Sequence, residues 1–464
     1  MNEKAFGIRR RDLLAAGAAG AALMATPAAA KGSTDWKPLA QDVKAQMAWA
    51  WEGYRKLAWG KDEIKPVSGG FSAFPLKTHH LGLSLIEALD TLWVMGLDAQ
   101  FDEGVHWATT KLDFDVDGEV SVFETSIRLV GGLLSAHHAC GDPILLSRAH
   151  DLAQRLLPAF ATPTGLPYRF INLRTGVPRE ASTSPADCAS FLPEWGTLSR
   201  LTGDPRFHDV AKRAAVAIFD RRSKLDLVAT GIDAVSGQWR TRRATVGSYC
   251  DSFFEYLWDG WQLLGDADCK RMYDVCTAAI LKHQQETFEG DLWICDVDFE
   301  TGVRIDRKQD ELASFYGGLL AQGGAHAQGA AYTQAWAKVQ TRFGVLPEEY
   351  DYGAHAATQV TNALRPELAD SAFNLWLLDR DERWRLITAE HFKAMKRWNK
   401  TTYGYTDLAD VTTTPKKQAD HCPGYWWSEQ MKYYWLIFSD TPRFNYAHNY
   451  LTTEGNVLLG FNRI

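Results

Sequence analysis

The sequence lacks the features that would indicate a nucleic-acid partner, a zinc site or a membrane span. The formal net charge is −7 and no tract of Lys and Arg opposes it, which excludes an electrostatic case for nucleic acid. The seven cysteines show no CxxC or similar metal-ligand spacing, so we expect most of them to be buried thiols. No apolar stretch after residue 30 approaches the roughly 20 residues that a transmembrane helix needs. Linkers rich in Pro, Ser or charge are also missing, which favours a single domain.

The N-terminus carries the one targeting signal in the chain. Arg10 and Arg11 are followed by Asp12, Leu13 and Leu14, then by a run of Ala, Gly, Leu and Met that ends at three alanines. This resembles a twin-arginine export signal; the alternative is a disordered basic leader. We therefore predict a signal over residues 1–30 and a mature protein over 31–464, located in the periplasm or secreted.

Helical patterns recur along the chain, whereas strand patterns are scarce. Apolar residues return at helical spacing in about thirteen or fourteen segments, for example 42–60, 83–97, 205–223, 248–265 and 382–400. Short turns such as "ACGDP", "LTGDPRF" and "LLGDAD" join consecutive segments. Because short links between antiparallel helices define hairpins, we predict an all-α toroidal barrel of six or seven helical hairpins.

Acidic residues recur on helical faces that should be apolar. Each has an ordinary explanation as a first-turn helix acid or as an ion-pair partner. Burial of so many carboxylates costs several kcal/mol each unless partners compensate, so folding alone does not account for the set. The chain also holds 18 Trp, 16 Tyr and 22 Phe, which could form the walls of a cavity lined by these acids. Such a cavity suits glycoside hydrolysis, in which one carboxylic acid protonates the leaving oxygen and a carboxylate activates water or attacks the sugar. The sites are Glu124, Glu194, Asp251 with Glu255, Glu367 with Asp370, and Glu429.

Several of these segments, in this order, carry a family resemblance. The motifs are "LIEALDTLWVMGL", "FETSIRLVGGLLSAH", "FLPEWGTLSRLTG", "DSFFEYL", "FYGG", "LRPELADS" and "SEQMKYYWLIF". With these motifs the chain resembles a bacterial member of glycoside hydrolase family 47, the α-1,2-mannosidases. This resemblance covers nearly all of the mature chain and implies an (α/α)₇ barrel, an inverting mechanism, and hydrolysis of terminal α-1,2-linked mannose from oligomannose glycans. We also expect the protein to be a monomer.

The resemblance also assigns roles to individual positions. It makes Glu124 the general acid, acting through a water, and Glu367 the general base, with Asp251 as a third carboxylate that is the alternative proton donor. Arg365 is expected to orient Glu367, and Arg128 to face the leaving-group side. The remaining residues predicted to bind substrate are Glu194, Asp370 and Glu429.

One calcium ion is the cofactor that the resemblance implies. Its direct protein ligand is a threonine, through both carbonyl and hydroxyl, which matches Thr453 in "YLTTEGN". Glu429, Glu454 and Asp370 are expected to hold the ion through water. A shell made only of oxygens suits calcium, which accepts many ligands in flexible geometry.

Two positions depart from the family pattern, and two other functions compete. Glu311 stands where the family has histidine, and Ser314 stands where it has cysteine, so the usual disulfide should be absent. The first rival is another inverting glycosidase on a six-hairpin barrel. The second is a receptor that binds mannose glycans without hydrolysing them. Retention of Glu124, Asp251 and Glu367 favours an enzyme.

Overall fold

The structure is a computed structural model that describes residues 34–440, 443–445 and 449–459. The predicted export signal, residues 1–30, lies outside the described residues. The chain divides into Met1–Asp35 and Trp36–Ile464, and the second unit holds the fold described below. Among the described residues, no helix combines the length and the apolar character needed to cross a membrane.

Seven described helices form a closed inner ring in the second unit. Each packs against the next in sequence order, and the last packs against the first, so the ring closes without an edge. They are short and mostly buried, as expected for helices enclosed on all sides. The inner helices are α2 (Leu83–Val94), α5 (Gly131–Cys140), α8 (Leu192–Thr202), α10 (Asp251–Leu264), α12 (Tyr316–Gln322), α14 (Glu367–Asp379) and α16 (Met431–Phe438).

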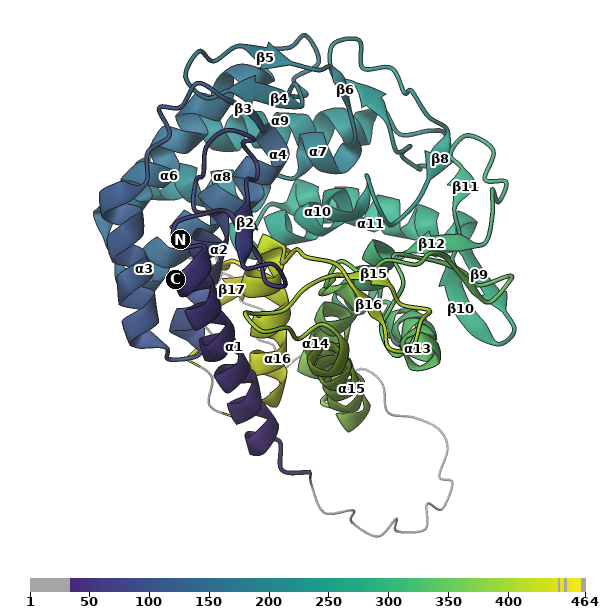
Figure 1. The fold of residues 1–464 in the computed structure, drawn as a ribbon. Helices are drawn as coiled ribbons and strands as arrows, with labels where there is room; N and C mark the ends of the chain where they lie inside the picture. Colours follow the sequence, from purple (N-terminus) through teal and green to yellow (C-terminus); the bar gives the residue numbers. More distant parts are fainter. Residues whose placement is uncertain (1–33, 441–442, 446–448, 460–464) are drawn as a thin grey trace, which may run out of the picture. The chain divides into compact units, whose positions relative to one another are not determined.

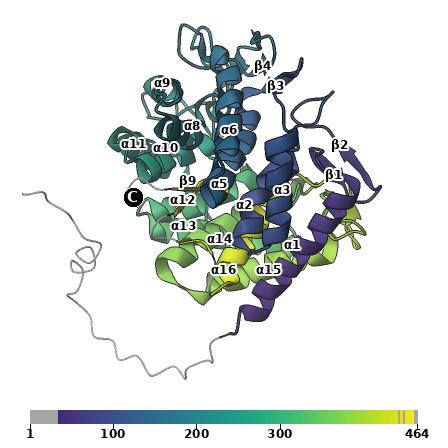
Figure 2. The same cartoon turned by 90° about the vertical axis from the view of Figure 1, so that its left-hand side faces the viewer.

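Seven described helices also form an outer layer, one against each inner helix. Six inner–outer pairs are consecutive hairpins, whereas the seventh joins α1 to α16, so the two ends of the colour scale meet in Figure 1. Figure 2 shows α1, α3 and α6 outside α2 and α5. The outer helices are α1 (Lys37–Leu57), α3 (Asp98–Lys111), α6 (Pro143–Leu156), α9 (Arg206–Asp220), α11 (Ala267–His283), α13 (His326–Phe343) and α15 (Glu382–Trp398). The arrangement confirms the predicted (α/α)₇ barrel.

Two consecutive residues, a glycine and an aspartate, form each of two hairpin turns between an inner helix and its outer helix. Gly141 ends α5 with φ 75°, a left-handed conformation that glycine adopts without steric cost, and the Asp142 side chain then caps α6 by accepting from the Ile144 amide at 2.8 Å. Gly265 and Asp266 repeat this between α10 and α11. These turns lie at one end of the barrel.

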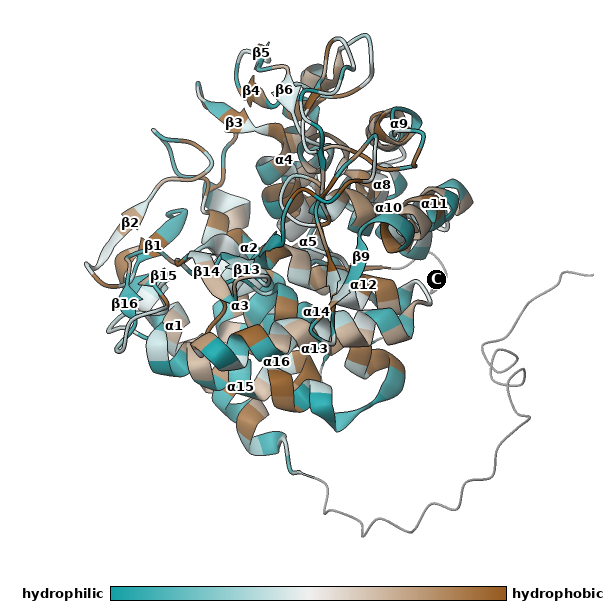
Figure 3. Cartoon of the chain, turned by 90° about the vertical axis from the view of Figure 1, so that its right-hand side faces the viewer, coloured by the Kyte–Doolittle hydropathy of each residue, from teal (hydrophilic) through white to brown (hydrophobic). Residues whose placement is uncertain are grey.

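The outer helices are amphipathic, as their sequence period predicts. Buried residues of α9 recur at helical spacing, from Phe207 through Ala211 and Ala214 to Ile218. Figure 3 shows hydrophobic and hydrophilic residues on the same helices, for example α9 and α15.

The seven cysteines are all free thiols, and none of them forms a disulfide. Six are buried and Cys140 is exposed, which confirms the expectation that most of them are buried thiols.

Apart from the sheet of β17 and β18, which follows the last inner helix, small antiparallel sheets occupy the longer loops that run from each outer helix to the next inner helix. These loops deliver the chain to the N-terminal ends of the inner helices, so residues at those ends converge on one mouth of the barrel. The strands are β1 (Glu63–Lys65), β2 (Gly70–Ser72), β3 (Glu119–Ser121), β4 (Phe170–Asn172), β5 (Pro178–Arg179), β6 (Ser182–Thr183), β7 (Ile232–Asp233), β8 (Arg243–Ala244), β9 (Gln285–Phe288), β10 (Asp291–Ile294), β11 (Val297–Asp298), β12 (Lys308–Asp310), β13 (Glu349–Asp351), β14 (Ala356–Gln359), β15 (Leu408–Asp410), β16 (Lys417–Gln418), β17 (Asn449–Leu451) and β18 (Val457–Leu459).

Six short helical segments precede or follow the main helices. Most of them fall within stretches that the sequence predicts as helical, but the sequence did not predict that they are separate from the main helices or that some are π or 3₁₀ helices. The pattern over 188–203 predicts one helix, whereas the structure breaks it into α7 and α8, with two residues between them. Two of the segments are π-helical, a form frequent at functional sites. The segments are α4 (Val122–Glu124), η2 (Thr125–Val130, π), η3 (Leu157–Phe160), α7 (Pro185–Ala189), η4 (Glu311–Phe315) and η5 (Trp426–Gln430, π).

Candidate active site

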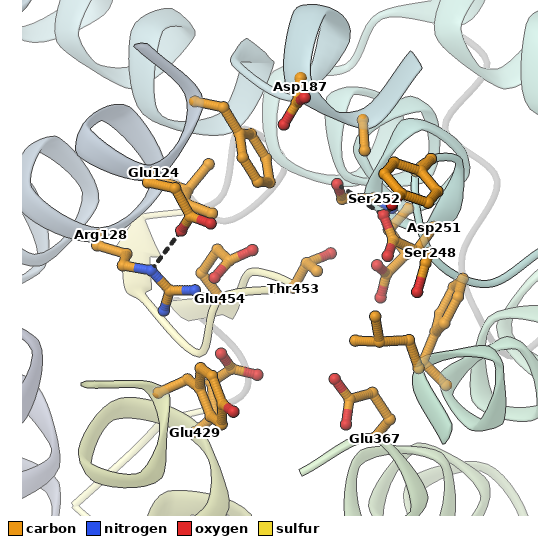
Figure 4. A pocket seen from close by; sticks show the side chains of 18 of the residues that line it. Glu124, Arg128, Asp187, Ser248, Asp251, Ser252, Glu367, Glu429, Thr453 and Glu454 are labelled. Atoms are coloured by element: carbon orange, nitrogen blue, oxygen red, sulfur yellow. Dashed lines mark hydrogen bonds and ion pairs between the residues drawn. The ribbon is translucent and has the colours of Figure 1, made fainter. Parts of the chain in front are cut away.

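One pocket at the N-terminal ends of the inner helices gathers nearly all the predicted site residues (Figure 4). In Figure 4, Glu124, Asp251, Glu367 and Glu429 point toward a common space, with Thr453 and Glu454 between them. Nine of the ten predicted residues line it: Glu124, Arg128, Asp251, Arg365, Glu367, Asp370, Glu429, Thr453 and Glu454.

Glu367 is the first residue of α14, directly after Pro366. The Pro366 carbonyl accepts from the Asp370 amide at 2.9 Å, so the proline starts the helix and fixes the position of Glu367. Removal from water raises the pKa of Glu367 to about 8, against the lowering effect of Arg365. One of its carboxylate oxygens, Oε2, has no hydrogen-bond partner, so it is available to a water or a ligand.

Asp251 is the first residue of α10 and faces the same pocket. Its Oδ1 accepts from the Ser252 amide at 2.8 Å, which orients the carboxylate. Loss of hydration, and to a smaller degree the repulsion of Asp310 and Glu454, raise the pKa of Asp251 to about 7. A carboxylic acid with this pKa can donate a proton at neutral pH.

Glu124 reaches the pocket with Arg128, one turn further along the chain. Arg128 Nε donates to Glu124 Oε2 at 2.7 Å, and its Nη1 donates to Glu87 Oε1 of α2 at 3.0 Å. The π-helix η2 begins directly after Glu124. The arginine thus bridges two carboxylates from neighbouring elements, and it lies 5.4 Å from the centre of the Tyr425 ring.

Among the described residues, the side-chain hydrogen bonds of Arg365 go to Glu348 and not to Glu367, and its predicted part in orienting Glu367 stays a prediction. Its Nε and Nη2 both donate to Glu348 Oε2, each at 3.1 Å. A helix that begins at Glu367 turns the preceding arginine toward the loop before α14, where Glu348 lies. Arg365 therefore acts on Glu367 through its charge, which lowers the pKa of the carboxyl group.

Glu194 lies behind the pocket wall rather than on it, and its predicted contact with substrate stays a prediction. Its side chain is fully buried in α8, where Oε1 accepts from the Tyr256 hydroxyl at 3.1 Å and Oε2 has no partner. Burial raises the pKa of Glu194 well above its usual value. The short helix α7 precedes α8 and supplies the pocket residue Asp187 instead.

The hairpin of β17 and β18 enters the centre of the ring and carries the tip residues Thr453 and Glu454. The Thr453 carbonyl accepts from the Tyr433 hydroxyl at 3.1 Å. On another side of the barrel, the Val457 amide donates to Asp90 Oδ2 of α2 at 3.0 Å. Contacts with helices on several sides place this hairpin across the inside of the barrel, and its tip lines the pocket.

The pocket has the composition of a hydrated cation site. Burial and mutual repulsion raise the pKa values of Asp370 and Glu454 to about 7, and that of Glu429 well above its usual value. A base at Glu367 must be ionised, and a cation nearby would favour that form. Among the described residues, no three His, Cys, Asp or Glu side chains converge closely enough to hold a metal directly. The Thr453 oxygens and the acids that line the pocket beside them supply the donor atoms and the negative charge that a hydrated cation requires.

Sequence reasoning named Glu255 without giving it a role, and it missed three further acidic residues of the site. Glu255 and Asp187 line the pocket, and Glu87 and Asp259 lie directly behind it, in contact with Arg128 and Thr453. Asp187 lies two positions after Pro185, in the first turn of a short helix that begins at this proline. Glu87 and Asp259 each lie within a mostly buried helix, α2 and α10, and a charged residue in such a helix is the signal that could have found them.

Glu311 does not line the pocket. It is buried behind Leu312 and Phe315, and the Asn362 side chain donates to it at 3.4 Å. Burial, together with the charges of Glu348 and Glu367, raises its pKa well above the usual value. Glu311 can therefore influence the site only indirectly, from behind the residues that line the pocket.

The buried carboxylates predict how stability depends on pH. Their folded pKa values lie above the unfolded ones, so their stabilising contribution is present at low pH and is lost as pH rises through about 7 to 8. We expect the melting temperature of the metal-free protein to fall by several degrees between about pH 6.5 and about pH 8.5. Burial lowers the pKa of His391 to about 4, so below about pH 6.5 this residue has the opposite effect and makes stability rise with pH.

Calorimetric melting curves of the chelated protein test this expectation. Added calcium should reduce the fall, because a cation favours the ionised carboxylates. A melting temperature that rises across the same interval would show that these groups are not held in a low-dielectric pocket.

Comparisons with known proteins agree with the geometry. The model of glycosyl hydrolase family 47 matches residues 46–459. Alpha-mannosidase I MNS5 of Arabidopsis thaliana is 35% identical over 449 residues, which cover 90% of this chain and 77% of the plant protein. Mannosyl-oligosaccharide 1,2-alpha-mannosidase IB of Mus musculus is 32% identical over 444 residues, with 90% and 69% covered.

A solved structure shares the fold. The α-1,2-mannosidase from Trichoderma reesei superposes with a TM-score of 0.82 at 24% identity, covering 92% of this chain and 100% of the fungal one. The match of the family model extends over the whole ring of helices and includes every residue that was predicted for the site. The chain therefore belongs to glycosyl hydrolase family 47 and is a glycoside hydrolase.

Proposed function

We propose that this protein is a calcium-dependent exo-α-1,2-mannosidase that removes terminal α-1,2-linked mannose from oligomannose glycans with inversion at the anomeric carbon. The observation that carries the proposal is the convergence of Glu124, Asp251 and Glu367 on one pocket, which the C-terminal hairpin crosses. A pocket obstructed on its inner side suits removal of one terminal sugar rather than cleavage within a chain. The names of the relatives supply the sugar and the linkage.

Glu367 is the general base in this proposal. It lies at the start of α14, and its unpartnered Oε2 can accept a proton from a water that attacks the anomeric carbon. Inverting enzymes keep room for that water between base and sugar. The charge of Arg365 favours the ionised carboxylate that a base requires.

The proton donor is one of two carboxyl groups on the other elements of the pocket. Asp251 has a pKa raised to about 7, whereas Glu124 is committed to an ion pair with Arg128. Asp251 is therefore the better acid at neutral pH by its environment, and Glu124 is suited to ordering a water that relays the proton. This assignment reverses the order of roles that the resemblance gave.

A calcium ion would be held by Thr453 through its carbonyl and hydroxyl oxygens, with waters anchored by Glu429, Glu454 and Asp370. When bound, the ion would grip vicinal sugar hydroxyls and favour a distorted ring. Thr453 is already fixed by Tyr433 and Asp259, and the acids nearby supply the negative charge that a divalent cation requires.

The stereochemical outcome tests the proposal. Proton NMR of α-1,2-mannobiose hydrolysis should show β-mannose as the first-formed anomer, because a single displacement by water inverts the anomeric carbon. First-formed α-mannose would require a covalent intermediate and would overturn the inverting mechanism. Binding without any hydrolysis would favour the receptor function.

We also propose that the protein is exported by the twin-arginine route and acts in the periplasm or outside the cell as a monomer. The pair Arg10 and Arg11 with the alanine-rich segment supports the export, and the enclosed barrel supports the monomer, since one chain closes the ring. No nucleic-acid partner is proposed, given the net charge of −7.

A further inference from the structure

Asp259 lies beneath the pocket and touches the residue proposed to bind calcium. It belongs to the third turn of α10, two turns beyond Asp251, and its side chain is 4% exposed. Its Oδ2 accepts from the Thr453 amide at 3.2 Å and from the Thr453 hydroxyl at 3.3 Å. Its Oδ1 accepts from the Tyr450 hydroxyl at 2.6 Å. One carboxylate thus accepts three hydrogen bonds from the C-terminal hairpin.

The direction of the Thr453 hydroxyl hydrogen decides what its oxygen can bind. A hydroxyl carries one hydrogen and two lone pairs, so it can face a cation only if the hydrogen points elsewhere. Asp259 accepts that hydrogen from the side away from the pocket. The lone pairs are then directed toward the space that Glu429 and Glu454 surround in Figure 4.

The carbonyl of Thr453 is fixed from a different element. Tyr433 of α16 donates to it at 3.1 Å, so α10 and α16 hold the two predicted ligand atoms of one residue. Among the described residues, Asp259 is the one hydrogen-bond partner of the Thr453 hydroxyl. Other contacts of the hairpin, such as those at Gly455 and Val457, lie beyond Glu454 and hold the backbone to Lys432 and Asp90.

We propose that Asp259 is a positioning residue that presets the Thr453 hydroxyl for calcium. The proposal rests on the calcium site of the proposed function. Groups that orient a metal ligand from behind typically account for about 10–100-fold in metal affinity. Asp259 does not line the pocket, so its effect should be on calcium binding rather than on the chemical step.

Calorimetric titration of the chelated protein with calcium tests the role of Asp259. Asp259→Ala removes the acceptor and should weaken calcium binding about tenfold or more. Asp259→Asn keeps one acceptor oxygen for the Thr453 hydroxyl and should stay within about threefold of the wild type. Tyr450→Phe removes a neighbouring hydrogen bond on the same carboxylate and should leave affinity nearly unchanged, which makes it the matched control.

A double-mutant cycle separates positioning from a general effect of charge. In the Thr453→Val background, which has no hydroxyl to orient, Asp259→Ala should cause little further loss of calcium affinity. Activity against calcium concentration supplies a second readout: Asp259→Ala should shift the half-saturating concentration while kcat at saturating calcium stays near the wild-type value.

The outcomes separate this inference from the calcium proposal itself. A wild-type protein that binds no calcium would remove the calcium site and the inference with it. A wild type that binds, with Asp259→Ala binding equally well, would overturn the inference alone. A loss of tenfold or more in Asp259→Asn relative to the wild type would also overturn it, because charge rather than the acceptor would then be responsible. This comparison with the wild type stands even if the alanine variant does not fold.

Discussion

Glu367→Gln is expected to lower kcat about 10²–10⁴-fold while the protein remains folded. The amide has nearly the same size as the carboxylate but cannot take a proton from the attacking water. The surroundings favour retention of the fold, since the side chain projects into the pocket and its Oε2 has no partner to lose. Steady-state hydrolysis of α-1,2-mannobiose, with melting curves of both proteins, measures the two effects separately.

The matched control is Glu382→Gln. Glu382 is also the first residue of a helix that follows a capping residue, but it lies in the outer helix α15 and accepts a hydrogen bond from Trp36 at 2.7 Å. If Glu367 only complements the helix dipole, the two variants should behave alike, with a modest loss of stability and full activity. Near-native turnover of Glu367→Gln would therefore remove the base from the proposed mechanism.

Removal of calcium is expected to suppress mannobiose hydrolysis by at least tenfold, and added calcium should restore it. Without a cation, the acids around Thr453 repel one another, and the raised pKa of Glu367, about 8, leaves the base largely protonated at neutral pH. Magnesium should restore much less, because it demands a small octahedral shell. Activity of the chelated enzyme with and without each ion measures the effect, and Thr453→Val should need more calcium than the wild type.

Full activity in a preparation shown to be metal-free by elemental analysis would contradict this expectation. The six-hairpin glycosidases would then again be relevant as mechanistic relatives, although the closed ring of seven inner helices already separates this fold from theirs.

The sequence predicted the helical hairpins of the barrel well because local sequence signals specify them. Helical spacing of apolar residues and the Gly-Asp turns are both short-range signals, and they specify each hairpin independently of the others. The closure between α1 and α16 depends instead on packing between the two ends of the fold, which no local pattern contains. Only the resemblance supplied the number of hairpins.

The sequence predicted which residues form the site better than it predicted the contacts among them. Proline before Glu367 and the aromatic setting of Asp251 are visible in the sequence, and both residues line the pocket. The pairing of Arg365 with Glu348 was not predicted, because Glu348 comes from a loop seventeen positions earlier and backbone geometry decides which way the arginine turns. The π-helices η2 and η5, which begin beside Glu124 and contain Glu429, have no sequence signature that short-range reasoning detects.

The C-terminal hairpin has a consequence for the order in which the molecule folds. Lys432 is completely buried, and it contacts Asp90 and the Gly455 carbonyl, while Asp90 also accepts from the Val457 amide, 367 positions along the chain. A buried charge that lacks its partners costs several kcal/mol. The ring of helices therefore cannot reach its final packing until the last segment has been synthesised and inserted. Contacts of such long range are formed slowly. Insertion of this hairpin thus acts as the closing step of folding, and a chain that folds this way has no working pocket before it is complete.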